Sequence, residues 1–185
     1  AGTPVKFEIL GFTSGDHSSL PDSVKVMYDA LKQQDPNNQV DFRSINMYEF
    51  KGFNSPHHVA LTTIGNMTTV PLGGTPTGDA ILIGHERLSK RPERRHVMFV
   101  LTDGQPDDPD ACREAVRAVE GCDVTVLGIG IQSNAVQNYF NDWIVLQDAR
   151  DMSAVVLSKL SDMLFKDRLK VGKKPKQTPS HIRAA

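Results

Sequence analysis

A glycine-rich turn followed by a buried strand is the pair of features that most constrains the fold of this chain. The turn, residues 73–80, leads into apolar residues at helical spacing and presents the hydroxyl of Thr75. The strand, residues 96–102, is almost continuously apolar, as expected for a strand buried on both faces, and Asp103 follows it at once. In an open α/β sheet, ligands bind beyond the carboxyl ends of the strands. A hydroxyl and a carboxylate there suit a hard divalent cation, which prefers oxygen ligands.

Strands and helices alternate along the rest of the chain, which is typical of βαβ units. With 185 residues, the chain has the length of a single domain. The hydrophobic pattern predicts strands at residues 5–12, 40–50, 96–102, 123–129 and 143–146, and helices at 21–33, 55–66, 77–90, 108–119, 135–140 and 152–165. The pattern therefore predicts an α/β fold, with the strand at 40–50 at an edge of its sheet.

Three segments resemble the von Willebrand factor A domain family: GGTPTGDA (73–80), FVLTDG (99–104) and VTVLGIGIQ (124–132). Within that family, the region from 73 onward and the early strand VKFEILGFTS look most like the C-terminal domain of the cobaltochelatase T subunit, including its phage-borne relatives. The resemblance covers roughly residues 4–165. It implies a three-layer α/β sheet, mostly parallel with an antiparallel edge strand, over residues 1–165.

The resemblance also implies a metal-ion-dependent adhesion site, which the family builds from a D-x-S-x-S loop, a threonine and an aspartate. By position, Thr75 is the threonine and Asp103 the aspartate, 28 positions apart. The implied cofactor is Mg²⁺ or another divalent cation, and a carboxylate of a partner completes its coordination. We expect no catalytic residue in this chain, because no nucleophile–base motif is present.

One part of the family pattern is absent, since the sequence contains no D-x-S-x-S. The nearest segment, residues 16–19, has the wrong spacing and follows the family's second strand. We therefore expect an N-terminally incomplete domain without its first, central strand, whose neighbours then have unpaired edges. Three explanations remain: a preceding segment, which we favour, a strand from another chain, or a degenerate substitute formed by Asp16 and Ser18.

The leading functional hypothesis is a metal-ion-dependent protein-interaction module that works with a ring-shaped AAA+ ATPase, as the resemblance implies. One alternative is a chelatase subunit that acts itself in metal insertion into a corrin-like macrocycle. Another is a nucleic-acid-associated protein that binds through the basic tail at residues 166–185. Gly73 and Gly78 imitate the start of a phosphate-binding loop, but Asp79 stands where that motif needs lysine, which argues against nucleotide binding. The acidic loop at 107–110 either tunes cation affinity, contacts a basic partner, or only supports the helix that follows.

Charge is unevenly distributed along the chain. Residues 166–185 contain seven Lys or Arg residues and one Asp, a net charge of +6, although the whole chain carries −1. We interpret this segment as a basic, flexible tail, with an acidic protein or a nucleic acid as its partner. The two cysteines, Cys112 and Cys122, predict free thiols in a reducing, cytoplasmic compartment, and no apolar run is long enough to span a membrane.

Overall fold

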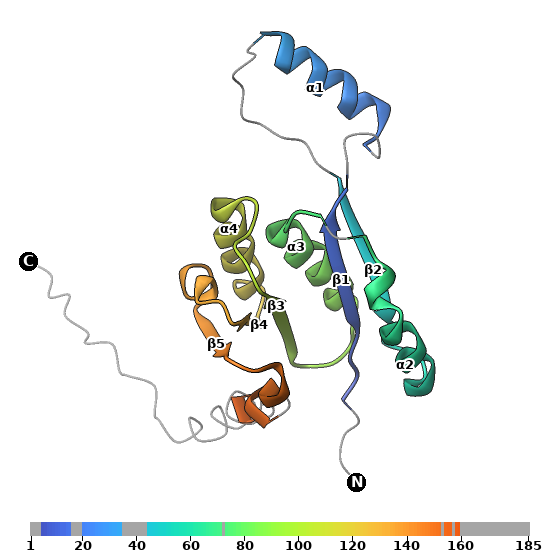
Figure 1. The fold of residues 1–185 in the computed structure, drawn as a ribbon, viewed down its shortest axis with the longest axis vertical. Coiled ribbons are helices and arrows are strands. Elements are labelled where there is room, and N and C mark those ends of the chain that lie inside the picture. Colours follow the sequence, from blue (N-terminus) through green and yellow to red (C-terminus); the bar gives the residue numbers. More distant parts are fainter. Residues whose placement is uncertain are drawn as a thin grey trace, which may run out of the picture. The chain divides into compact units, whose positions relative to one another are not determined.

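The computed structural model in Figure 1 describes residues 5–15, 20–34, 44–71, 73–152, 154–156 and 158–159. The chain divides into two compact units, Ala1–Val145 and Leu146–Ala185. The strands are β1 (Ile9–Ser14), β2 (Ile45–Lys51), β3 (His96–Thr102), β4 (Val124–Ile131) and β5 (Asp142–Leu146). The helices are α1 (Asp22–Gln34), α2 (His57–Gly65), α3 (Thr77–Ser89) and α4 (Pro109–Glu120), with 3₁₀ turns η2 (Met67–Thr69), η3 (Ala135–Asn138) and η4 (Ala149–Asp151).

Strands β3, β4 and β5 form one sheet in that order, with β3 and β4 parallel. Their register pairs His96 with Val124 and Thr102 with Gly130, so both strands end at the same edge of the sheet. The central strand β4 is buried along most of its length, because the run VTVLGIGI has few polar side chains that need water. This sheet therefore places Thr102 and the loop after it at the carboxyl edge.

Strands β1 and β2 form a second, antiparallel sheet, with a register shift between Ile9 and Leu10. The antiparallel pair and the parallel pair together confirm the predicted mixed α/β fold. Among the described residues no strand joins the two sheets, so β3 is paired on one side only. The expectation that the central strand of the family is missing from this sequence stays a prediction.

Helices α3 and α4 pack against each other and against the three-stranded sheet. Their apolar faces meet β4 in a core that includes Ile81, Val116, Val119 and Val126. A Cβ atom at Gly78 would lie 3.0 Å from the Ala111 carbonyl, so glycine lets the two helices approach closely. Helix α4 begins after Asp108, whose Oδ1 accepts hydrogen bonds from the backbone N–H groups of residues 110 and 111 at 3.0 and 2.9 Å.

Helix α3 also contacts β1 and β2, and so touches both sheets (Figure 1). Arg87, in its last turn, donates from Nε to Glu8 Oε2 at 2.9 Å and from Nη2 to Glu8 Oε1 at 2.5 Å. The same guanidinium contacts the Glu49 carboxylate of β2. The hydrogen bonds that Arg87 donates to Glu8 raise the pKa of Arg87, so the guanidinium stays charged at all ordinary pH values.

Most predicted elements lie within a few residues of those observed. Strand β3 has the predicted bounds, whereas β1 begins at Ile9 and ends at Ser14, instead of spanning 5–12. The predicted helix at 135–140 is the shorter 3₁₀ turn η3. Of the predicted helix at 152–165, the described residues 152, 154–156 and 158–159 are helical, and the rest, like the tail 166–185, lies outside the described residues. No helix in the described part is long and apolar enough to cross a membrane.

The two cysteines are free and differ in exposure. Cys112 is buried in the core on α4, and burial raises its pKa to about 11, whereas Cys122 is exposed in the turn after that helix. We expect iodoacetamide at about pH 8, near the ordinary thiol pKa, to modify Cys122 alone in the folded protein, because the thiolate is the reactive form. Mass spectrometry of the intact chain measures this as one adduct, which becomes two in denaturant. Equal modification of both thiols in the folded chain would contradict the burial of Cys112.

Candidate functional site

The two predicted metal ligands lie in loops at the ends of the elements that the sequence indicated. Thr75 is half-buried in the loop directly before α3, and Asp103 is exposed directly after β3. In the part of the chain that the structure describes, the Asp103 carboxylate has no hydrogen bond or ion pair. An exposed carboxylate without a partner keeps its oxygen atoms available to a cation or to water.

The structure brings these two loops into contact through backbone groups. The Thr75 carbonyl oxygen accepts a hydrogen bond from the Asp107 N–H at 3.0 Å, and another from the Thr77 N–H at 2.8 Å. The loop after β3 is therefore tied to the loop before α3 at Asp107, four residues beyond Asp103. The family resemblance implied that these two loops share a site, whereas the part played by Asp107 follows only from the structure.

The end of strand β1 also contacts the glycine-rich loop. The Gly74 N–H donates to Ser14 Oγ at 2.6 Å, and the Ser14 N–H donates to the Gly74 carbonyl at 3.2 Å. These reciprocal bonds fix the hydroxyl of Ser14 beside the glycine-rich loop. Sequence reasoning missed Ser14, because it ended the first strand at Phe12 and no local motif links residues that are 60 positions apart.

Close packing at Gly74 explains the glycine in this loop. A Cβ atom built on Gly74 would collide with the Asp107 carboxylate and lie 2.8 Å from Ser14 Oγ. A side chain at this position would require both Asp107 and Ser14 to move. Asp107 thus lies beside the glycine-rich loop, and its effect on cation affinity stays a prediction. Its neighbour Asp108 caps α4, which confirms that the acidic loop supports this helix.

Thr13, the residue before Ser14, carries a buried hydroxyl that has no hydrogen-bond partner among the described residues. Thr13 is only 6% exposed, and its Oγ1 finds no partner among the described residues. A Cβ atom on Gly73 would lie 2.8 Å from this oxygen, which places Thr13 beside the same loop as Ser14. An unsatisfied buried hydroxyl costs about 1–3 kcal/mol, so a donor supplied by bound water or a ligand would stabilise the site.

The donor set fits a hard divalent cation. The side chains gathered by the three loops offer hydroxyl and carboxylate oxygens, which are the ligand atoms that Mg²⁺ prefers. No group of three or more His, Cys, Asp or Glu side chains with metal-binding geometry occurs among the described residues. A cation held here would thus have few protein ligands and retain several water molecules. The sequence alternative Asp16 with Ser18 lies outside the described residues.

The chain is similar to a known protein family over most of its length. Residues 2–166 match the family model described as the VWA domain of the cobalamin biosynthesis protein CobT, where VWA denotes von Willebrand factor A. The match spans both sheets, the two predicted site loops and the helices between them. The chain belongs to the CobT VWA domain family.

Proposed function

We propose that this chain is the protein-interaction domain of a cobaltochelatase-type complex, and that it binds its partner through a divalent cation at the Thr75–Asp103 site. Membership of the CobT family supports a role in cobalamin biosynthesis. The observation that carries the proposal is the exposed, unpaired Asp103 carboxylate at the carboxyl edge of the sheet, beside loops tied together at Thr75. Cobalt is the cargo of such a complex, and the domain acts in the cytoplasm.

Each loop has a separate task in this proposal. Thr75 and Asp103 would hold the cation, which supplies an electrophilic centre for an incoming carboxylate. Asp107 lies close enough to Gly74 to add negative charge beside the site, and Ser14 fixes the glycine-rich loop through its hydroxyl. Because few protein oxygens are offered, open coordination positions remain for water and for the partner's acidic side chain.

The partner that we propose is a ring-shaped AAA+ ATPase subunit. An ATPase ring changes conformation as it hydrolyses ATP, and a docked interaction domain transmits that movement to a target. The chain itself is then a non-catalytic subunit. The competing hypothesis, in which this chain itself holds the metal to be inserted, needs nitrogen or sulfur ligands, and the described residues contain no such cluster.

Asp103→Ala is expected to abolish Mg²⁺-dependent capture of the AAA+ subunit of a cobaltochelatase complex. The free energy of unfolding should change by less than about 0.5 kcal/mol, because surface substitutions away from packing and hydrogen-bond networks have small effects. Capture on immobilised chain is measured with Mg²⁺ and with EDTA, and unfolding is followed in urea. Asp29→Ala on α1 makes the same charge change at an exposed position and serves as the control.

Three results would contradict the proposal. Capture that does not depend on Mg²⁺ in the unaltered chain would remove the cation from the interaction. Mg²⁺-dependent capture that survives in Asp103→Ala would place the cation elsewhere. A loss of capture in both Asp103→Ala and Asp29→Ala would indicate a general effect of net charge, and would likewise overturn the site.

A further inference from the structure

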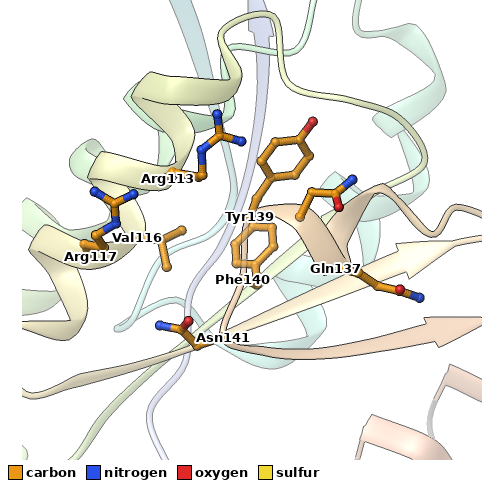
Figure 2. Close-up of a pocket in the computed structure, with 8 residues that line it drawn as sticks. Arg113, Val116, Arg117, Gln137, Tyr139, Phe140 and Asn141 are labelled. Carbon is orange, nitrogen blue, oxygen red and sulfur yellow. The ribbon is translucent and has the colours of Figure 1, made fainter.

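A polar pocket lies between α4 and the segment that links β4 to β5, away from the loops of the candidate metal site. Its volume is about 180 Å³, and Figure 2 shows Arg113 and Arg117 of α4 on one side and Tyr139 and Asn141 on the other. Val116 and Phe140 complete the lining with apolar surface, and both are almost fully buried. The pocket is thus an open, mostly polar hollow with a small apolar patch at its base.

The two arginines are four residues apart on α4 and therefore lie on the same face of the helix. Arg113 Nη2 donates to Asp110 Oδ1 at 2.5 Å, and its Cζ lies 5.7 Å from the centre of the Tyr139 ring. The ring and the carboxylate together orient this guanidinium. Because Asp110 is largely exposed, its ion pair contributes only about 0–1 kcal/mol, so a ligand can replace it at little cost.

Arg117 has no acceptor of its own. Among the described residues, its guanidinium makes no hydrogen bond or ion pair, although it lines the pocket. A guanidinium carries five N–H donors in a planar fork that matches the two oxygens of a carboxylate. Together with the oriented guanidinium of Arg113 on the same helix face, Arg117 offers the pocket a second set of N–H donors for an anion.

The opposite wall adds further donors. Gln137 and Asn138 bring side-chain amides to the pocket, and the Asn141 amide Nδ2 donates to Glu120 Oε2 at 2.6 Å, which fixes that side chain. The negative charges of Asp110 and Glu120 flank the two arginines, so the local formal charge is near zero. This balance disfavours a dianion such as phosphate and favours an anion with a single charge.

We propose that this pocket is a carboxylate-binding site, which takes the Asp or Glu side chain of a partner protein. The fork of Arg117 binds the two carboxylate oxygens, and Arg113 exchanges Asp110 for the incoming group. The small apolar patch of Val116 and Phe140 contacts the methylene groups of the ligand side chain. This proposal needs no metal ion, and it stands or fails independently of the function proposed for Thr75 and Asp103.

The test is a titration of the full chain, monitored by NMR through the arginine Nε–H signals and the Asn141 amide. The probe is the blocked peptide acetyl-Gly-Glu-Gly-amide, and acetyl-Gly-Gln-Gly-amide and inorganic phosphate are titrated separately. We expect saturable shifts at Arg113, Arg117 and Asn141 with the Glu peptide, and none with the Gln peptide. Arg117→Gln should weaken binding about tenfold or more, because hydrogen bonds to charged groups contribute about 1.5–3 kcal/mol each.

Two further variants distinguish the effect of the guanidinium geometry on binding from the effect of its charge. Arg117→Lys retains the charge but loses the fork, and should bind with an affinity between those of the unaltered chain and Arg117→Gln. Arg94→Gln removes an exposed arginine elsewhere and should bind as the unaltered chain does. No saturable shift with the Glu peptide, equal binding of the Gln peptide, or undiminished binding by Arg117→Gln would overturn the proposal. Tighter binding of phosphate than of the Glu peptide would overturn the assignment to a carboxylate.

Discussion

Leu127→Ala is expected to lower the free energy of unfolding by about 3 kcal/mol, within the range of about 2–5 kcal/mol that such substitutions cost in protein cores. Leu127 lies on β4, the central strand of its sheet, and its side chain is 0% exposed. Removing its outer carbon atoms leaves a cavity that the surrounding side chains cannot fill completely, because interiors are close-packed. A loss of this size is a large share of the 5–15 kcal/mol that stabilises a typical domain.

The matched control is the same substitution on the adjacent strand. Leu101 of β3 is 41% exposed, so Leu101→Ala should cost less than about 1 kcal/mol. Urea unfolding of both variants and of the unaltered chain, with equal slopes, gives the two differences directly. An equal decrease in the free energy of unfolding for both variants would show that the core does not centre on β4.

The unpaired edge of β3 is expected to make the 185-residue chain self-associate as its concentration rises. Beyond β4, the described residues place no strand beside β3, so one edge presents open N–H and C=O groups along an apolar strand. Sedimentation velocity over a dilution series should show species larger than the monomer at the higher concentrations. Leu101→Lys, a charge at an exposed position of this strand, should shift the distribution back to the monomer.

The other edge of the same sheet supplies the control. Trp143 of β5 is exposed to nearly the same extent as Leu101, so Trp143→Lys adds the same charge to a different edge strand. Association that persists in Trp143→Lys but not in Leu101→Lys would locate it at β3. A chain that remains monomeric at every concentration would contradict the prediction. We propose that a strand from a preceding segment or another chain covers the β3 edge, and its addition should suppress self-association.

Local pattern predicted the elements better than it predicted the site. The bounds of β3 were correct because an uninterrupted apolar run has little ambiguity, whereas β1 was placed too early because Val5 and Phe7 are apolar but exposed. The loops of Thr75 and Asp103 were identified from motifs whose residues are close in sequence. The contributions of Thr13 and Ser14 depend on contacts with a loop about 60 positions away, and no local pattern records such a contact.

Strand β1 and helix α3 are joined to each other at both ends, which makes their lengths interdependent. Ser14 binds Gly74 just before the helix, and Glu8, just before the strand, binds Arg87 in the last turn. Six strand residues span about 20 Å at 3.3 Å each, and thirteen helical residues span about 20 Å at 1.5 Å each. Adding one residue to either element alone would put one of the two attachments out of reach. The strand and the helix must therefore change length together if both attachments are to be kept.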